Sequence, residues 1–194
     1  MRVLVTGTTG GIGGAVASAA LARGHDVVAF NRVDFDALAG APRAPFSAEG
    51  PFDAVAFCTG TCPVRPAALT SDELFAETFR VNCGLFLSLV RRIVAERLYD
   101  PAGFRAVAVS SVSAVEGWPG GAAYCASKGA LSALCRALDA ELAPKRISVR
   151  ALEPRHVRTR MFEECAGRMG TDPSLARDPA DFALEVLNEM EAGK

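Results

Sequence analysis

Val3-Leu4-Val5-Thr6-Gly7-Thr8-Thr9-Gly10-Gly11-Ile12-Gly13 is a short apolar run that passes through closely spaced glycines into an alanine-rich segment. The run is typical of a buried strand, and the segment is typical of a helix. Glycines at positions 7, 11 and 13 let the backbone turn tightly and approach a pyrophosphate closely. The first N–H groups of the helix would then face that anion, assisted by the helix dipole. This context predicts a strand, a dinucleotide-binding turn and a helix in succession.

Unbroken apolar runs recur along the chain between longer helical patterns. The predicted strands lie at 3–6, 27–30, 54–58, 106–109 and 147–152, and the predicted helices at 11–23, 71–98, 123–142 and 180–190. Runs without alternation indicate parallel strands that are covered on both faces. Strand–helix alternation indicates right-handed crossovers and a doubly wound sheet, with the ligand at the carboxyl ends of the strands. We therefore predict an α/β fold of the Rossmann type, with one NAD(P)-binding domain over residues 1–194.

Local signals mark several boundaries. Thr70 and Glu73 have capping-box spacing before the second helix. Asp178-Pro179 has the form of an N-cap followed by a first helical residue. Residues 39–50, which are rich in Ala, Pro and Gly, predict an irregular region.

Composition narrows the class of protein. Half of the 194 residues are apolar and the formal net charge is −1. This balance argues against nucleic acid as the main partner, because phosphate binding requires a basic surface. No stretch has the length needed to cross a bilayer, and the apolar run at the N-terminus is too short for a secretory signal. These features predict a cytoplasmic protein with neither nucleic acid nor a membrane as its partner.

The cysteines form no CxxC pair, and neither histidine lies near a cysteine pair. We therefore expect no metal site. Most of the cysteines lie in apolar segments, so we expect small buried hydrophobes in a reducing compartment. The six cysteines are at positions 58, 62, 83, 125, 135 and 165.

Asn31-Arg32 follows the second predicted strand, where two related cofactors are distinguished. Sites that prefer NAD often have an acidic residue there, which binds the 2′-hydroxyl of the ribose. An amide followed by an arginine suits a 2′-phosphate, because a guanidinium pairs with phosphate through two hydrogen bonds. We therefore favour NADP(H) over NAD(H). Asp34 is open to two interpretations, a partner for the adenine amine or the cap of a turn.

Ser110 and Ser111 end a predicted strand at the ligand-binding edge, and Tyr124 begins a predicted helix. Lys128 follows four residues later, so it shares a helix face with Tyr124. A phenol with a pKa near ~10 is a poor acid–base at neutral pH, and lowering that pKa by about three units takes roughly 4 kcal/mol. A nearby ammonium and an oxidised nicotinamide ring both favour the phenolate. Tyr124 would then exchange a proton with a substrate oxygen while hydride moves at the adjacent carbon.

Over residues 2–159 the chain resembles the short-chain dehydrogenase/reductase family. Thr6-Gly7-x-x-x-Gly11-Ile12-Gly13 matches the cofactor motif of that family, and Tyr124-x-x-x-Lys128 matches its catalytic pair. Ser111 falls at the catalytic serine, and Asn82 falls at the catalytic asparagine. Four positions in the right order and spacing make this match specific.

The resemblance implies a role for each of these side chains. Tyr124 would be the general acid–base. Lys128 would bind the nicotinamide ribose and lower the pKa of the tyrosine. Ser111, preferred over its neighbour Ser110 on spacing, would bind the substrate carbonyl. Asn82 would hold a water that links Lys128 to solvent, or it would be a buried amide in a kinked helix, and both interpretations can hold together.

The implied activity is hydride transfer between NADP(H) and a small carbonyl or secondary alcohol. Pro154 and Thr159 match positions that line the nicotinamide amide. The residues predicted to bind the cofactor are Gly7, Thr9, Gly10, Gly11, Ile12, Asn31, Arg32, Asp34, Cys58, Thr59, Gly60, Tyr124, Lys128, Pro154, Val157 and Thr159.

The chain departs from the family pattern in two loops. Phe57-Cys58-Thr59-Gly60 replaces the usual Asn-Asn-Ala-Gly, which keeps the glycine but loses the asparagine side chains. Glu153-Pro154-Arg155 replaces the usual Pro-Gly. We expect Arg155 to point to solvent rather than to an acidic substrate, because loop arginines are mostly exposed.

The chain is also shorter than the family pattern. Residues 31–53 leave too little room for the usual helix, strand and helix, so one βα unit should be reduced or missing. The last strand of the family has no counterpart after residue 190, which makes tetramers on that edge less favoured. A homodimer through the helices at 71–98 and 123–142 stays open.

The altered loops favour a second hypothesis, a dinucleotide-binding sensor that keeps the fold without turnover. The set of Asn82, Ser111, Tyr124 and Lys128 opposes it, since a sensor does not need all four. An epimerase or dehydratase of the same superfamily is a third interpretation, which the short chain disfavours. We expect residues 118–121 to line the substrate pocket, with an apolar lid formed by Met161, Phe162 and Met169.

Overall fold

The computed structural model describes residues 1–35 and 45–192. The described residues form one parallel sheet of five strands in the order β2-β1-β3-β4-β5. The strands are β1 (Arg2–Thr6), β2 (Asp26–Phe30), β3 (Ala54–Phe57), β4 (Phe104–Val109) and β5 (Ile147–Leu152). The predicted α/β class and parallel sheet are confirmed. The strand order reverses between β1 and β3, and a crevice for a ligand opens at such a switch point.

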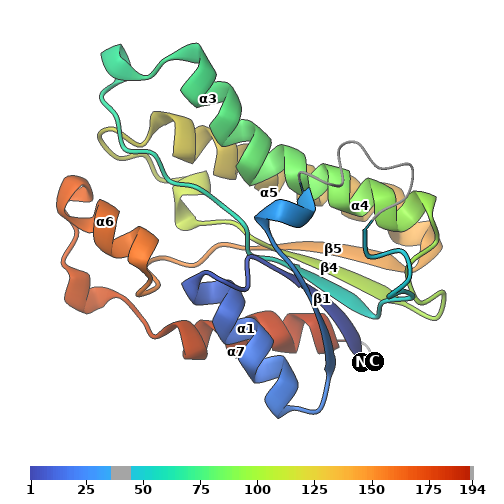
Figure 1. The fold of residues 1–194 in the computed structure, drawn as a ribbon. Coiled ribbons are helices and arrows are strands. Elements are labelled where there is room, and N and C mark those ends of the chain that lie inside the picture. Colours follow the sequence, from blue (N-terminus) through green and yellow to red (C-terminus); the bar gives the residue numbers. More distant parts are fainter. Residues whose placement is uncertain (36–44, 193–194) are drawn as a thin grey trace.

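Helices cover both faces of the sheet (Figure 1). Helices α1 (Gly11–Ala22) and α7 (Pro179–Glu191) pack on one face. Helices α4 (Leu85–Ala95) and α5 (Ala122–Leu142) pack on the other. Successive side chains of a strand point to opposite faces, so Val3 and Val5 enter one core while Leu4 enters the other. This double burial explains the unbroken apolar runs of the central strands.

The outer strands do not follow the prediction of two fully covered faces. In β2 and β5 several side chains are exposed or half-buried, whereas every residue of β3 is buried. Each outer strand has a neighbour on one side only in the described sheet, so less packing surrounds it.

The predicted helix at 71–98 is wrong as a single element. The structure has α3 (Asp72–Phe79), a π-helical turn at Arg80–Gly84, and then α4. The predicted cap is also wrong, because the side chain of Ser71 accepts the hydrogen bond from the N–H of Leu74. Such π-turns are rare and occur frequently at functional sites.

The remaining elements complete the chain after β5. Helix α6 (Arg160–Met169) has Thr159 as its N-cap, and α7 begins after the predicted cap Asp178. Short 3₁₀ turns lie at Ala67–Leu69, Val112–Ala114, Ala143–Lys145 and Pro173–Leu175. Within the described residues, no helix is long and apolar enough to span a membrane.

The connection between β2 and β3 is reduced, as predicted. Residues 32–35 are helical and residues 45–49 form a turn, and these described parts of the connection contain no strand. Half of the irregular region predicted at 39–50, residues 39–44, lies outside the described residues. Within these described parts, no strand extends the sheet beyond β2.

The expectation of buried cysteines is wrong for four of the six. Cys135 and Cys165 are buried, while the others are half-buried. No group of metal-ligating side chains is found in the described part of the chain.

Candidate active site

A pocket of about 720 Å³ lies at the carboxyl ends of the strands. The glycine-rich turn and the loops after β2, β3, β4 and β5 all contribute to its wall. Of the residues predicted to bind cofactor, the pocket is lined by Gly7, Thr9, Gly10, Gly11, Ile12, Asn31, Arg32, Cys58, Thr59, Gly60, Tyr124, Lys128, Pro154, Val157 and Thr159. Asp34 is a described residue outside this lining.

The glycine-rich turn, Gly7–Gly13, forms a concave backbone surface, called the glycine cradle below, whose space would be filled if these residues had side chains. Gly7 has a φ of +67°, a conformation that favours glycine. A Cβ on Gly13 would collide with the carbonyl oxygen of Gly7, and one on Gly11 would come within 2.7 Å of Thr159 Cγ2. The N-cap Gly10 leaves the first N–H groups of α1 without a side-chain partner. This open, uncapped helix end fits a pyrophosphate.

Thr6, which the sequence analysis did not assign, joins the turn to the loop after β3. Its buried Oγ1 accepts hydrogen bonds from the backbone N–H groups of Cys58 (3.0 Å) and Thr59 (3.2 Å). The hydroxyl of Thr59 donates to the same atom at 2.9 Å. These bonds position the altered loop without asparagine side chains. The signal in the sequence that could have identified Thr6 was a hydroxyl residue at the end of the first apolar run, directly before Gly7.

The loop after β2 holds its own residues in place. The Asn31 side chain donates to Thr8 Oγ1 at 3.0 Å, which ties this loop to the glycine-rich turn. The Asp34 carboxylate accepts a hydrogen bond from the Asn31 backbone N–H at 2.6 Å. The cap interpretation of Asp34 therefore describes its role, and the adenine interpretation has no support in its position. Arg32 is exposed and lines the pocket.

Ser111 and Tyr124 meet at the inner part of the pocket. The Ser111 side chain lies close enough to the Tyr124 phenol to act on its pKa. The Ser113 backbone N–H donates to Ser111 Oγ at 3.1 Å, so the proton of Ser111 can point towards a partner in the pocket. Burial raises the pKa of Tyr124 above its ordinary value, and the Ser111 side chain opposes this rise. Tyr124 is consequently a neutral phenol at pH 7.

Ser110 is engaged elsewhere. Its hydroxyl donates to the main-chain oxygen of Lys128 at 3.1 Å and pairs with the hydroxyl of Ser132 at 2.8 Å. Ser132 in turn donates to the Glu153 carboxylate at 2.6 Å. This chain of bonds fastens α5 to the sheet, which leaves Ser111 as the serine that faces Tyr124.

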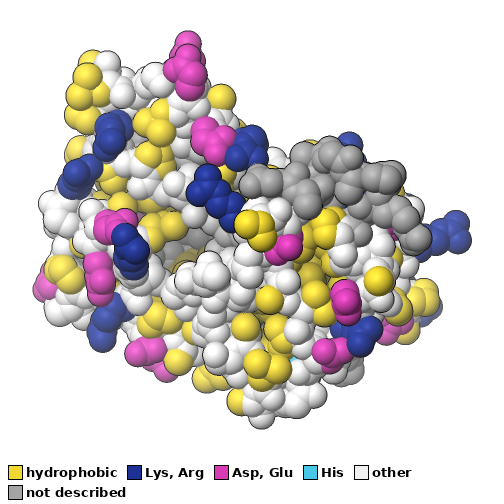
Figure 2. Space-filling model, in the orientation of Figure 1, with side chains coloured by type: hydrophobic (Ala, Val, Ile, Leu, Met, Phe, Trp, Pro, Cys, Tyr) yellow, Lys and Arg dark blue, Asp and Glu magenta, His cyan; other side chains and the backbone are white. Residues whose placement is uncertain are grey.

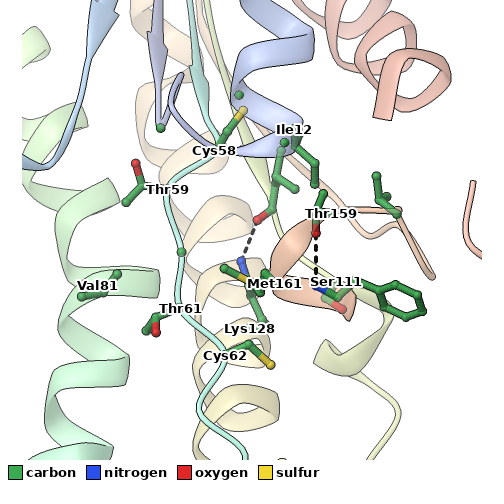
Figure 3. Close-up of a pocket in the computed structure, with 18 of the residues that line it drawn as sticks. Ile12, Cys58, Thr59, Thr61, Cys62, Val81, Ser111, Lys128, Thr159 and Met161 are labelled. Carbon is green, nitrogen blue, oxygen red and sulfur yellow. Dashed lines mark hydrogen bonds between the residues drawn. The ribbon is translucent and has the colours of Figure 1, made fainter. Parts of the chain in front are cut away.

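Lys128 reaches from α5 into the centre of the pocket wall (Figure 3). Its ammonium donates to the main-chain oxygen of Val109 at 2.8 Å and lies 5.8 Å from the centroid of the Tyr124 ring. Burial lowers the pKa of Lys128 to about 8. The ammonium thus lies near the phenol ring, as the shared helix face predicts, and it is also fastened to the end of β4.

Asn82 lies behind the pocket wall and is completely buried in the π-helical turn. Its amide oxygen accepts from the Thr61 backbone N–H at 2.7 Å. Its amide nitrogen donates to the Thr61 carbonyl and to Ser127 Oγ, both at 2.9 Å. The hydroxyl of Ser127 then donates to the main-chain oxygen of Tyr124 at 2.7 Å. The interpretation as a buried amide in a distorted helix is thus confirmed.

Helix α6 supplies the apolar side of the pocket. Met161, Phe162 and Met169 line it, as predicted. Cys62 and Cys165, which the sequence analysis missed, line it as well. The thiol of Cys165 donates to the main-chain oxygen of Cys62 at 3.5 Å. Burial raises the pKa of the Cys62 thiol above its usual range, so Cys62 is neutral in this wall.

Two expectations about the neighbouring loops have different outcomes. Residues 118–121 are described but do not line the pocket, and Trp118 instead donates from its ring nitrogen to Ser113 Oγ at 3.1 Å. Trp118 thus supports the loop of Ser111 from behind. Arg155 lies at the pocket edge, and its guanidinium pairs with Glu116 at 2.8 Å on an exposed surface. The expected solvent-facing position of Arg155 is confirmed.

The fold and this site define an α/β protein with a dinucleotide-type turn and a buried Ser–Tyr–Lys cluster. The family model of short chain dehydrogenases matches residues 36–169. The chain therefore belongs to the short-chain dehydrogenase family, whose members are oxidoreductases that bind a nicotinamide dinucleotide. The matched segment begins after the glycine-rich turn, so the assignment of that turn depends on its own geometry.

Curated relatives span nearly the whole chain. Carbonyl reductase [NADPH] 2 of Sus scrofa is 31% identical over 91% of this chain and 78% of its own length. L-xylulose reductase of Homo sapiens is 31% identical over 100% of this chain and 82% of its own length. A 3beta-hydroxysteroid dehydrogenase of Mediterraneibacter gnavus is 30% identical over 99% of this chain and 79% of its own length. The reductases among these relatives act on small carbonyl compounds.

Solved structures share the fold. A dehydrogenase/reductase from Sinorhizobium meliloti has a TM-score of 0.77 and 26% identity, and the match covers 97% of this chain and 87% of that one. A Beutenbergia cavernae protein crystallised with bound NADP at low occupancy has a TM-score of 0.83 and 24% identity, with coverage of 97% and 88%.

Proposed function

We propose that this protein is an NADP(H)-dependent reductase that converts a small carbonyl compound to a secondary alcohol, and the reverse. One observation carries the proposal. A single pocket is lined both by the glycine cradle and by Ser111 and Tyr124. A dinucleotide held on the cradle has its reactive ring within the same pocket as a proton donor, which is what coupled hydride and proton transfer requires.

The preference for NADP(H) is supported by local charge. Arg32 follows β2 at the pocket wall, where a guanidinium can pair with a 2′-phosphate. The Asn31 side chain beside it is a neutral amide. A relative named for its use of NADPH and a structural neighbour with bound NADP point the same way.

The residues of this chain suit the reductive direction. Tyr124 is a neutral phenol, so its O–H can donate a proton to the carbonyl oxygen as charge develops there. The Ser111 hydroxyl donates a hydrogen bond to the same oxygen and stabilises that charge. A bound reduced nicotinamide supplies the hydride to the carbonyl carbon. The carbonyl thereby gains one hydride and one proton, and Tyr124 is reprotonated from solvent.

Lys128 and Asn82 support this proton donor in different ways. Lys128 is charged at pH 7, because its pKa of about 8 still lies above that pH, and its positive charge favours the phenolate left after transfer. Asn82 is a positioning residue in this proposal. It binds Thr61 and Ser127, and Ser127 binds the main chain of Tyr124. The proposed substrate class is a neutral carbonyl, since beyond its first residue, Arg160, helix α6 lines the pocket with Met161, Phe162, Cys165 and Met169.

Fluorescence titration with NADPH and NADH, followed by turnover assays on a panel of carbonyl compounds, tests the proposal. We expect NADPH to bind more tightly and the panel to contain substrates. Tyr124→Phe should lower kcat by about 10³-fold while changing the Kd for NADPH by less than about twofold. Tyr99→Phe is the matched control, because Tyr99 is the other tyrosine of the chain and packs against Phe104. NADPH binding without turnover, unaffected by Tyr124→Phe, would identify a sensor instead.

The proposal also includes a cytoplasmic location, a single domain over residues 1–194 and a homodimer through the face of α3, α4 and α5. Phe75 and Leu87 are large apolar side chains that are 42% exposed on α3 and α4. Light scattering after size-exclusion chromatography measures the assembly, and a mass of one chain, 20.3 kDa, would overturn the dimer.

A further inference from the structure

An ion pair lies at the far side of the same pocket from Tyr124. Arg80, the first residue of the π-helical turn, binds the carboxylate of Glu77 in α3 through two hydrogen bonds of 2.6 and 2.8 Å. Both side chains are about half exposed. Both line the pocket together with Asn31 and Arg32. The proposed cofactor site therefore has charged groups from α3 and the π-turn, in addition to those after β2.

The carboxylate of Glu77 is influenced by two guanidinium groups. The hydrogen bond from Arg80 holds the pKa of Glu77 below its usual range, and the charge of Arg32 acts in the same direction. Figure 2 shows dark blue and magenta side chains grouped above a hollow of this face. Among the described residues, two guanidinium groups and one carboxylate meet at this wall of the pocket, and the carboxylate occupies part of the capacity of the guanidinium groups to bind an anion.

The π-turn fixes where Arg80 emerges. Two residues further on, Asn82 is buried and bound to both backbone groups of Thr61 in the loop after β3. The backbone of Arg80 is thus fastened to the same loop that borders the glycine cradle, while its exposed guanidinium can exchange one anion for another. The described residues that connect β2 to β3 contain no strand that would separate the π-helical turn from Arg32.

We propose that Arg80 is a second guanidinium for the 2′-phosphate of NADP(H), beside Arg32, and that Glu77 holds Arg80 at the site until the phosphate replaces the carboxylate. This inference depends on the proposed function, since it concerns the cofactor of that reaction. A phosphate monoester carries a charge of about −1.5 to −2 at pH 7, so it competes well with a single carboxylate for the guanidinium. Glu77 lowers the affinity for the phosphate because it must be displaced and then lies near another anion.

The inference predicts that replacing Arg80 and replacing Glu77 have opposite effects on the affinity for NADPH. Arg80→Gln should weaken binding of NADPH about tenfold and change the Kd for NADH by less than about twofold. Glu77→Gln should strengthen binding of NADPH about threefold, again with little effect on NADH. Adenosine 2′,5′-bisphosphate and 5′-AMP, compared by isothermal titration calorimetry, isolate the 2′-phosphate from the nicotinamide. A purely structural ion pair would give both variants the same direction of change.

Arg177→Gln and Glu185→Gln are the matched controls. Their ion pair of 2.7 Å is similarly exposed, and neither residue is among the described residues that line the pocket. Equal losses for NADPH and NADH in Arg80→Gln, or weaker NADPH binding in Glu77→Gln, would overturn the inference and leave the proposed function intact. If the wild-type protein binds neither dinucleotide, the proposed function fails and this inference fails with it.

Discussion

The two ends of the pocket are built from opposite kinds of interaction. At the inner end, defined by Ser111, Tyr124 and Lys128, the serine and the lysine are buried and hydrogen-bonded to main-chain atoms, and the tyrosine is half-buried beside them. At the outer end, defined by Arg32, Glu77 and Arg80, the charged groups are exposed, and Glu77 and Arg80 form an ion pair with each other.

The inner end therefore suits the chemical step, and the outer end suits the choice between cofactors. Buried hydrogen bonds are strong, and leaving one unmade is costly, so the inner end has one arrangement. Exposed ion pairs contribute only about 0–1 kcal/mol and are screened by salt, so the outer end can exchange partners at little cost. In the proposed function, the inner end would hold the proton donor rigidly while a few surface charges would select the cofactor.

The largest expected effect concerns the inner end. Ser111→Ala should lower kcat by about 10²-fold, because it removes the hydrogen bond that stabilises the developing oxyanion. Ser110→Ala is the matched neighbour. It should leave kcat within about twofold and lower the free energy of unfolding by about 1 kcal/mol, since Ser110 only fastens α5. Steady-state kinetics and thermal unfolding measure the two effects, and a larger loss of kcat in Ser110→Ala would reverse the assignment.

A smaller effect is expected at the outer end. Arg32→Ala should reduce the preference for NADPH over NADH about tenfold, through loss of a charge-assisted pair with the 2′-phosphate. The ratio of kcat/KM values for the two cofactors measures this preference, with kcat for a saturating carbonyl substrate unchanged. Raising the ionic strength should reduce the same ratio. If NADH is already the better cofactor of the wild type, Arg32 does not select for phosphate.

The third effect concerns the free energy of unfolding, through the cost of burying Lys128. The fall of its pKa from 10.5 to about 8 corresponds to about 3 kcal/mol of destabilisation at pH 7. Lys128→Met removes this cost but leaves the Val109 carbonyl without its donor, so the net gain in stability should be about 1 kcal/mol. Turnover should be lost at the same time. Differential scanning calorimetry measures the gain, and a lower melting temperature would show that Lys128 stabilises the fold.

The pH dependence of stability has a defined sign. The folded-state pKa of Lys128 lies below its unfolded value, so between pH 8 and 10.5 the unfolded chain binds more protons. The contribution of Lys128 to the free energy of unfolding therefore rises over this window. The same contribution should be missing from the profile of Lys128→Met.

The amino-acid sequence by itself determined the elements and the chemical character of the site. Apolar runs, the glycines of the turn and the spacing of Tyr124 and Lys128 act over a few residues, so they are legible without long-range contacts. The reduced connection between β2 and β3 followed from a count of residues. The Asp178 cap was likewise a local signal.

Only the tertiary structure decided how these side chains are used. The π-helical turn depends on Asn82 meeting Thr61 and Ser127, which are 21 and 45 residues away. Thr6 holds a loop that begins 52 residues later, and Lys128 turns to a main-chain oxygen 19 residues before it. Each choice is set by whichever partner a buried polar group meets when distant segments pack together. No local pattern of residues encodes that meeting, because it arises from the sheet order and from the helices laid across it.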